Sequence, residues 1–455
     1  MSVNLFSHEL AKLSNGIESS HFNSAVSINS VVIDSRKAQG NSLFVAIKGD
    51  NHDGHDYVAG VLENPTNFAL VNHDYPHQLP NLIRVADTIA ALGLLAQGYR
   101  QRFKLPLVAI TGSNGKTTVK EMLKSVCECA FGREQVLATS GNLNNHLGMP
   151  LTLLELNTKH QVAIIEMGMN HSGELDYLSQ LAQPTLAAIN NVMFAHAGHF
   201  KSLTAIAKAK GEIYNGLSPV GIACLNLGSE FSALWQEQLI NLGRQIFPYA
   251  TTASGCYLEA IDDTGGHYVT PAGKLLVKLQ VLGKHNYDNA LTVIALALNL
   301  GCSLADIKSG LEQYSGYKGR LERKRAFNGA LIIDDTYNAN PDSVLAALAA
   351  VAGLAKPLWF IFGDLKELGA REVEFHQQIG QALTKFGVNR LLTIGNLAKS
   401  AADCFGGEKI HFESNQDIVK YCTLQLPESA TLLIKGSNSM NLAEIAALLS
   451  TGGHY

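Results

Sequence analysis

The chain has 455 residues, of which 46% are hydrophobic and 16% are charged. Folded proteins average about 25% charged residues, so this composition excludes a disordered, highly charged chain. The 35 Lys and Arg residues against 39 Asp and Glu residues give a net charge of −4, which argues against bulk binding to nucleic acid or to an anionic membrane. At about 150 residues per domain, the length predicts three domains.

The sequence also bears on where the protein works. Its apolar runs are all shorter than the ~20 residues needed to cross a bilayer, and its first ten residues lack the basic and apolar segments of a signal peptide. Seven cysteines, an odd number with no C-x-x-C pair, indicate reduced thiols. We therefore expect a cytoplasmic, monomeric protein without membrane insertion.

The first block of the chain, residues 1–83, predicts a small α/β domain with short strands at 30–33 and 43–46. A turn-rich stretch with prolines at both ends, residues 76–80, comes near its end, and a helix is predicted at 88–103. We expect this proline-containing stretch to act as a hinge to the next domain.

The middle block, residues 84–314, alternates apolar strands with helical patterns. This alternation predicts a parallel sheet with helices on both faces. The segment 226–283 is less regular and richer in β signals, and it stays unassigned. The strands are predicted at 105–110, 162–165 and 186–189, and a helix at 288–300.

The last block, residues 315–455, alternates again and predicts a second, Rossmann-like sheet. Pro341 opens a helix for which Asn340 is the expected N-cap. A second hinge is expected at 314–319. The predicted fold class is therefore α/β, with three domains. The strands are predicted at 331–333, 358–362, 390–394 and 431–434.

The strongest motif is the segment 109–118, which reads AITGSNGKTT between an apolar strand and a helix. Gly112 and Gly115 let successive backbone N–H groups converge on phosphate oxygens. Lys116 supplies a positive charge and Thr117 a hydroxyl for magnesium. The segment lacks the first glycine of the general phosphate-loop pattern G-x-x-x-x-G-K-[ST]. The alternative interpretation is that it is only a structural junction between the strand and the helix. We predict that this loop binds a nucleotide's phosphates.

Carboxylates follow two apolar strands. Glu166 lies at the end of the apolar strand at 162–165. Ligands bind at the carboxyl edge of an open parallel sheet, so Glu166 is predicted to be either a magnesium ligand or a turn residue. Asp334 and Asp335 are adjacent carboxylates at the end of an apolar strand. Placing both charges there costs free energy unless cations lie close to them. Arg320 is a nearby cation, and it is suited to clamp a transferred phosphoryl group. A helix cap is the alternative role for the pair.

Taken together, these motifs resemble the Mur ligase family over essentially the whole chain. Segment 110–118 is similar to the family's own phosphate loop, which explains the missing glycine. Segment 141–150 is similar to the family's segment that faces the muramyl-peptide substrate. Segment 283–290 is similar to the family's segment beside the adenine of the nucleotide. Segment 334–341 is the most type-specific stretch. One departure is Asn438, which stands where the pattern has arginine.

The resemblance implies the roles of individual residues. Taken alone, His196 is interpreted as a loop histidine and Lys210 as a solvated lysine. Only the resemblance gives these two residues a role in the site. Implied ATP-binding residues are Gly112, Ser113, Asn114, Gly115, Lys116, Thr117, Thr118, Asn286, Asn289, Arg320 and Asp335. Implied metal ligands are Thr117, Glu166, His196 and Lys210, the last as a carbamate. Implied substrate-binding residues are Ser35, Arg36, Asn144, Asn145, Tyr337, Asn338 and Asn340. Implied catalytic residues are Lys116, Lys210, Arg320 and Asp335.

The resemblance also implies an activity. It is that of an ATP-dependent ligase, with two Mg²⁺ ions, that joins D-alanyl-D-alanine to UDP-N-acetylmuramoyl-tripeptide through an acyl phosphate, forming the pentapeptide precursor of peptidoglycan. The first domain would hold the UDP group. The alternatives are the muramyl ligase that adds the third, diamino acid residue, a folylpolyglutamate-synthase-like ligase, and a catalytically silent nucleotide-binding scaffold.

Overall fold

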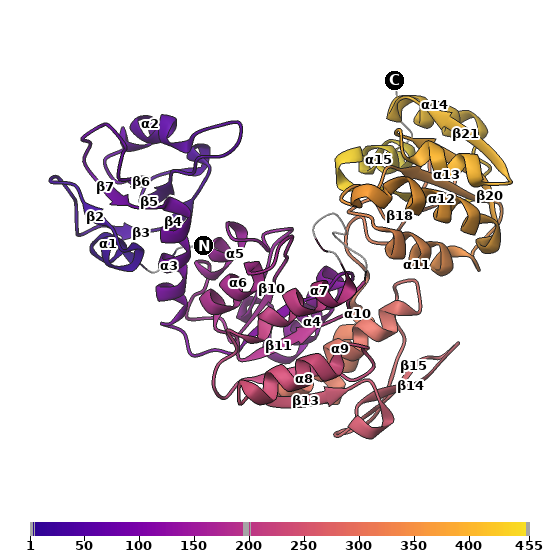
Figure 1. Cartoon of the computed structure of the whole chain (residues 1–455), viewed down its shortest axis with the longest axis horizontal. Helices are drawn as coiled ribbons and strands as arrows, with labels where there is room; N and C mark the ends of the chain where they lie inside the picture. Colours follow the sequence, from indigo (N-terminus) through magenta and orange to yellow (C-terminus); the bar gives the residue numbers. More distant parts are fainter. Residues whose placement is uncertain (1–2, 4, 194–199, 201, 452–455) are drawn as a thin grey trace.

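The computed structural model describes residues 3, 5–193, 200 and 202–451. Figure 1 shows three lobes in chain order, with the N-terminal and C-terminal lobes on opposite sides of the central lobe. Each lobe is built on its own sheet. Among the helices described, none is long and apolar enough to span a membrane.

The N-terminal lobe holds a five-stranded sheet in the order β2-β7-β6-β5-β4, parallel except for β2 at one edge. Residues 76–80 connect β6 to β7 within this sheet, so the expectation that they form a hinge between domains is wrong. The predicted domain limit at residue 83 falls inside β7. The elements are β1 (Leu5–Phe6), α1 (Ser7–Ser14), β2 (Ile17–Glu18), β3 (Ser27–Ile28), β4 (Ser30–Val32), β5 (Ser42–Val45), α2 (Val58–Leu62), β6 (Phe68–Asn72) and β7 (Leu82–Val85).

The connection to the central lobe is the helix α3 (Thr88–Arg100). Its N-cap is Asp87, whose carboxylate accepts hydrogen bonds from the backbone N–H groups of Ile89 at 2.7 Å and Ala90 at 3.0 Å. Near its other end, the buried Tyr99 hydroxyl donates to the carbonyl oxygen of Leu156 over 2.8 Å. This helix therefore carries the chain from the first sheet onto the central lobe.

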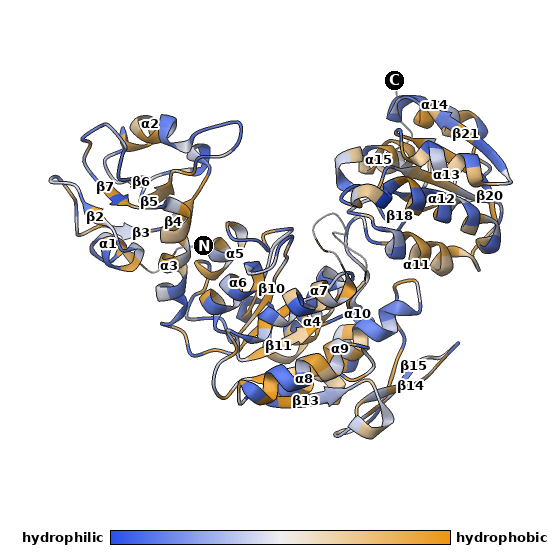
Figure 2. Cartoon of the chain, viewed as in Figure 1, coloured by the Kyte–Doolittle hydropathy of each residue, from blue (hydrophilic) through white to orange (hydrophobic). Residues whose placement is uncertain are grey.

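The central lobe is a six-stranded parallel sheet in the order β13-β12-β11-β8-β10-β9. In β8, Leu107 and Ala109 point into one hydrophobic core and Val108 and Ile110 into another, because successive side chains of a strand face opposite sides. Such strands carry apolar residues on both faces, and Figure 2 shows orange, hydrophobic colour along much of this sheet. The strands are β8 (Leu107–Thr111), β9 (Val136–Ala138), β10 (Val162–Glu166), β11 (Leu186–Ile189), β12 (Ile222–Asn226) and β13 (Gln245–Tyr249).

Helices cover both faces of this sheet, as the alternation predicted. The unassigned segment 226–283 contains β13 and a small antiparallel sheet, β14 (Tyr257–Asp262), β15 (Gly265–Thr270) and β16 (Gly273–Val277), which packs against α9 and α10. The helices are α4 (Lys116–Phe131), α5 (Gly148–Leu153), α6 (Glu174–Ala182), α7 (Leu203–Gly211), α8 (Ser232–Asn241), α9 (His285–Asn299) and α10 (Leu304–Gln313).

The C-terminal lobe has a six-stranded sheet in the order β17-β18-β22-β19-β20-β21. Five strands are parallel, and the polar edge strand β17 is antiparallel to β18. The predicted α/β fold with parallel sheets is thus confirmed. The strands are β17 (Glu322–Arg325), β18 (Leu331–Asp334), β19 (Leu358–Gly363), β20 (Val388–Ile394), β21 (Glu408–Phe412) and β22 (Thr431–Lys435), and the helices are α11 (Pro341–Val351), α12 (Glu372–Ala382), α13 (Ala398–Cys404), α14 (Asn415–Gln425) and α15 (Ala443–Thr451).

Candidate active site

The phosphate loop lies between the end of β8 and the start of α4, as predicted. Gly115 has φ +76°, and a Cβ there would lie 2.6 Å from Asn289 Oδ1 and 2.7 Å from Asn190 Nδ2. Both the backbone angle and the space therefore require glycine. The loop is held from the side by Asn191, whose carbonyl oxygen and Oδ1 accept the backbone N–H groups of Ser113 and Asn114 at 3.0 and 2.9 Å.

A row of asparagine amides connects the loop to α9. Asn190 Nδ2 donates to the carbonyl oxygen of Asn114 over 3.0 Å and to Asn289 Oδ1 over 2.8 Å. Asn289 Nδ2 in turn donates to Asn286 Oδ1 over 2.9 Å. The structure therefore brings Asn286 and Asn289, predicted from a segment far along the chain, next to the phosphate loop.

Two lysines lie beside this loop, of which Lys116 is half-buried and Lys210 is buried. Lys116 Nζ donates to the carbonyl oxygens of Gly112 and Ser113 at 2.7 and 3.3 Å, and burial lowers its pKa, which nearby Glu166 partly restores. Lys210 is 2% exposed, and within the described part of the chain no side chain forms an ion pair or hydrogen bond with its amine. Burial, assisted by the charge of Lys116, holds the pKa of Lys210 well below its ordinary value.

A carboxylate, a hydroxyl and a guanidinium meet at the end of β10. Glu166, 2% exposed, accepts hydrogen bonds from Thr117 Oγ1 at 2.9 Å and Asn144 Nδ2 at 2.8 Å. Arg320 reaches across from the C-terminal lobe, and its Nη2 donates to Thr117 Oγ1 over 3.0 Å. Hard oxygen donors of this kind suit Mg²⁺, which usually takes only one or two protein carboxylates together with phosphate oxygens.

This arrangement is not a metal cage made by protein alone. No group of three or more His, Cys, Asp or Glu side chains that could hold an ion occurs in the described ranges 5–193 and 202–451. The expected ligand His196 lies outside the described residues. Thr117 and Glu166 are brought together, and the Lys210 amine is buried and unpaired among the residues described.

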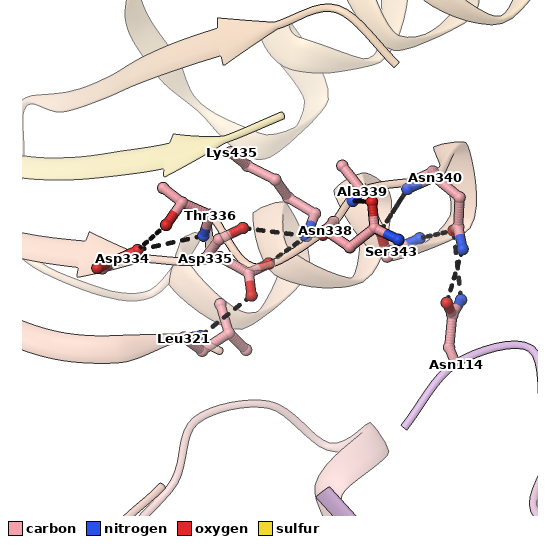
Figure 3. A network of polar contacts seen from close by, with 10 residues as sticks. All are labelled: Asn114, Leu321, Asp334, Asp335, Thr336, Asn338, Ala339, Asn340, Ser343 and Lys435. Atoms are coloured by element: carbon pink, nitrogen blue, oxygen red, sulfur yellow. Dashed lines mark hydrogen bonds and ion pairs between the residues drawn. The ribbon is translucent and has the colours of Figure 1, made fainter. Parts of the chain in front are cut away.

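The C-terminal lobe contributes a network of polar contacts around Asp335 (Figure 3). Its carboxylate forms a buried ion pair with Lys435 at 2.6 Å and accepts the backbone N–H of Leu321 at 3.1 Å. Asp334 instead pairs with Lys324 at 2.5 Å. Each carboxylate therefore meets a cation, and in both cases this cation is a lysine on an adjacent strand and not Arg320.

Arg320 has a different environment. Its guanidinium carbon lies 4.3 Å from the centre of the Tyr337 ring, a cation–π geometry. The backbone N–H of Tyr337 donates to the carbonyl oxygen of Gly319 over 3.0 Å, which fixes this loop against the one carrying Arg320. The guanidinium is thereby aimed at Thr117 and the phosphate loop.

One cleft of about 1720 Å³ lies between the central and C-terminal lobes. Thr117 and Lys210 are buried and do not line it themselves. Ser35 and Arg36 belong to the N-terminal lobe and do not line it, and Arg36 instead pairs with its neighbour Asp34 at 2.8 Å. The predicted residues that line the cleft are Ser113, Asn114, Gly115, Lys116, Thr118, Asn144, Asn145, Glu166, Asn286, Asn289, Arg320, Asp335, Tyr337, Asn338 and Asn340.

The sequence analysis missed three residues of this site: Asn190, Asn191 and Lys435. Asn190 and Asn191 directly follow β11, and Lys435 ends β22. A polar residue at the carboxyl end of a parallel strand was the available signal, since ligands bind at that edge of such sheets.

The whole chain is similar to known ligases. Family models match residues 27–100 (Mur ligase family, catalytic domain), 110–297 (Mur ligase middle domain) and 319–438 (Mur ligase, glutamate ligase domain). The UDP-N-acetylmuramoyl-tripeptide–D-alanyl-D-alanine ligase of Haemophilus influenzae is 37% identical over 428 residues, covering 92% of this chain and 93% of that protein.

Solved structures agree with these matches. A crystal structure of MurF from Acinetobacter baumannii has a TM-score of 0.88 and 33% identity, covering 99% of both chains. The Thermotoga maritima MurF ligase in complex with ADP has a TM-score of 0.80 at 23% identity, covering 93% of this chain and 97% of that one, which shows the shared fold. The chain belongs to the Mur ligase family.

Proposed function

We propose that this protein is the ATP-dependent ligase that joins D-alanyl-D-alanine to UDP-N-acetylmuramoyl-tripeptide. The observation that carries the proposal is the meeting of Lys116, Glu166 and Thr117 with Arg320 in one cleft between two lobes. The name of the Haemophilus influenzae relative supports the choice of substrates, and the ADP in the Thermotoga maritima ligase supports the choice of nucleotide.

The first step joins two anions. The terminal carboxylate of the tripeptide attacks the γ-phosphorus of ATP, its bond to the β-phosphate oxygen breaks, and ADP and an acyl phosphate result. Lys116 and Arg320 approach this region from opposite lobes, so they oppose the negative charge that grows on the transferred group.

The second step forms the peptide bond. The neutral amine of D-alanyl-D-alanine attacks the acyl carbon, the carbon–oxygen bond to phosphate breaks, and inorganic phosphate and the pentapeptide leave. The amine gives up a proton in this step, and the departing phosphate takes it up. The cleft can serve both steps because its walls carry the phosphate loop on one side and the Tyr337 loop on the other.

Two further groups fit the residues present. Thr117 and Glu166 would hold Mg²⁺, which supplies positive charge to the phosphate oxygens when it is bound. Lys210, whose low pKa favours the neutral amine, is suited to add CO₂ and lose a proton, giving a carbamate whose oxygens can hold a second ion. His196 completes the proposed set of ligands.

The other expectations extend this proposal. The N-terminal lobe holds the UDP group, with Ser35 and Arg36 near the uracil and phosphates. The central lobe binds ATP, and the C-terminal lobe completes the ligase site. The muramyl-peptide contacts are assigned to Asn144, Asn145, Tyr337, Asn338 and Asn340. We place the protein in the cytoplasm as a monomer.

Phosphate release from ATP tests the proposal. UDP-N-acetylmuramoyl-tripeptides ending in either meso-diaminopimelate or L-lysine are each combined with D-alanyl-D-alanine, and every component is left out in turn. We expect ADP, phosphate and pentapeptide in equal amounts, only when all components are present. Release with UDP-N-acetylmuramoyl-dipeptide and a diamino acid, or with a folate and glutamate, contradicts the assignment.

A further inference from the structure

A tight turn lies where the chain passes from the central lobe to the C-terminal lobe. It runs from Tyr317 to Arg320, and the backbone N–H of Arg320 donates to the carbonyl oxygen of Tyr317 over 3.0 Å. Gly319, with φ +70°, reverses the backbone between them. Arg320 lines the cleft, but Tyr317 does not. Tyr317 therefore affects the reaction only through the residues that it contacts.

Two aromatic rings lie between two cations at this turn. The ammonium of Lys120 on α4 lies 5.4 Å from the centre of the Tyr317 ring. The centres of the Tyr317 and Tyr337 rings are 6.2 Å apart with an angle of 72° between the ring planes, an edge-to-face pair. Arg320 contacts the same Tyr337 ring at 4.3 Å. Both cation–ring distances are in the attractive range, so the Tyr337 ring is held by Tyr317 as well as by Arg320.

The cation on the central lobe is firmly fixed. Lys120 is fully buried, and its Nζ donates to the carbonyl oxygen of Thr139 over 2.7 Å and pairs with Glu121 Oε1 at 2.7 Å. Thr139 Oγ1 in turn accepts the backbone N–H of Glu166 over 2.9 Å. The ring of Tyr317 thus packs against a cation that is attached to the strand end carrying Glu166.

These contacts form a closed circuit between the two lobes. On one side, Arg320 Nη2 donates to Thr117 Oγ1, which donates to Glu166 Oε2. On the other side, the two rings connect Arg320 to Lys120 and so, through Thr139, back to Glu166. The position of the guanidinium in the cleft therefore depends on the ring of Tyr317.

We infer that Tyr317 is a positioning residue, which holds the Tyr337 ring, and through it Arg320, against the phosphate loop. The inference rests on the proposed function, in which Arg320 opposes charge on the transferred phosphoryl group. A misplacement of about 1 Å at such a group can lower a rate by about 100-fold. The ring and not the hydroxyl does this, since no hydrogen bond of the Tyr317 hydroxyl occurs among the residues that the structure describes.

Phosphate release in the presence of UDP-N-acetylmuramoyl-tripeptide and D-alanyl-D-alanine tests the inference. For Tyr317→Leu we expect kcat to fall about 5- to 30-fold, as for loss of one cation–π and one aromatic contact, and the KM of ATP to change by less than about 3-fold. Tyr317→Phe keeps the ring and should recover most of the lost kcat. In the background of Arg320→Ala, adding Tyr317→Leu should not lower the residual kcat further, because Tyr317 acts through Arg320.

The control is Tyr257→Leu, which makes the same change at a half-buried tyrosine of β14 outside the cleft lining and should leave kcat unchanged. Melting temperatures show that the compared variants are folded. Normal kcat in Tyr317→Leu, equal losses in the Leu and Phe variants, or a further loss in the Arg320→Ala background each overturn the inference and leave the proposed function standing. A wild-type enzyme that releases no phosphate with both substrates contradicts the proposed function itself, and the inference with it.

Discussion

Asn114 in the phosphate loop and Asn340 at the start of α11 exchange amide hydrogen bonds between the central and C-terminal lobes. Asn340 Nδ2 donates to Asn114 Oδ1 over 2.7 Å, and Asn114 Nδ2 donates to Asn340 Oδ1 over 3.3 Å (Figure 3). The same Asn340 Oδ1 caps α11 by accepting the backbone N–H of Ser343 at 2.9 Å. One side chain thus begins a helix and holds the loop of the other lobe.

A double-mutant cycle tests whether this pair is a working contact between lobes. Asn340→Ser keeps a good N-cap, but its side chain is too short to reach Asn114. Asn114→Ala removes the partner of Asn340 on the phosphate loop. We expect each variant to lower kcat/KM for ATP about 3- to 10-fold, in line with one or two hydrogen bonds, and the double variant to lose no more than either. If the fold-losses of the two single variants multiply in the double variant, the two residues act independently and the coupling is contradicted. Asn340→Ala serves as the control for the cap, and it should also lower stability by about 1 kcal/mol.

Lys116 is expected to act on the reaction and not on the fold. Lys116→Ala removes a half-buried cation whose partners are two carbonyl oxygens, and we expect kcat to fall about 100- to 1000-fold or more with thermal stability retained. Phosphate release and circular dichroism measure the two quantities. Lys124→Ala, on an exposed turn of the same helix, should change neither by more than the ~0.5 kcal/mol of a surface ion pair. Near-normal turnover by Lys116→Ala removes the loop from the mechanism.

The elements that the sequence predicted are those whose signals are local. The phosphate loop, the strand before it and the cap of α11 each depend on a few adjacent residues, and all three are found where the pattern placed them. The edge strand β17, with the sequence ERKR, was missed because it has no apolar residue to mark its buried face. The prolines at 76 and 80 indicated a turn correctly, but a turn pattern does not say whether it joins two strands of one sheet or two domains.

The contacts of the site were harder to predict than its members. Arg320 and Thr117 are separated by 203 positions in the chain, and Lys435 and Asp335 by 100. Which cation meets which carboxylate depends on strand order, and β22 lies directly beside β18 only because the sheet is not assembled in chain order. Sequence therefore predicted the residues Asp334, Asp335 and Arg320, but it did not identify the lysines that pair with the two carboxylates.

The lowered pKa of Lys210 gives a prediction about CO₂. In buffer with ¹³C-bicarbonate we expect a protein carbamate signal by ¹³C NMR in the wild type and none in Lys210→Ala. Because only the neutral amine adds CO₂, this signal and the activity should both decline as the pH falls toward the low pKa of the amine. Lys208→Ala, an exposed neighbour on α7, should keep both. A wild type without the carbamate signal, together with an active Lys210→Ala variant, defeats the idea.

The pair formed by Asp335 and Lys435 should be structural as well as functional. Asp335→Ala leaves the ammonium of Lys435, only 2% exposed, without its carboxylate, and we expect a loss of about 3–5 kcal/mol in the stability of the C-terminal lobe. The double variant Asp335→Leu with Lys435→Met removes both charges and should recover most of that stability while staying inactive. Denaturant unfolding and phosphate release distinguish these outcomes. If the double variant is as unstable as the single one, the cost does not come from an unpaired buried charge.

His376, fully buried on α12, should make the stability of the C-terminal lobe depend on pH. Its Nε2 accepts the backbone N–H of Leu365 over 3.0 Å, so the ring is neutral in the fold, and burial lowers its pKa from 6.5. Below that value the unfolded chain binds a proton that the folded chain refuses. The contribution of this residue is thus complete above pH 6.5 and decreases as the pH falls through the lowered pKa, by at most about 1.4 kcal/mol per pH unit.

The fluorescence of Trp359 in β19 reports unfolding of this lobe when the other tryptophan is replaced, as in Trp235→Phe. Between about pH 7.5 and pH 5.5 we expect stability to fall less in His376→Gln than in the parent, since glutamine does not titrate. At the higher pH the variant should be less stable by about 1–3 kcal/mol, because the buried N–H of Leu365 loses its acceptor. A variant with the same pH dependence as its parent shows that other groups set the acid sensitivity of the lobe.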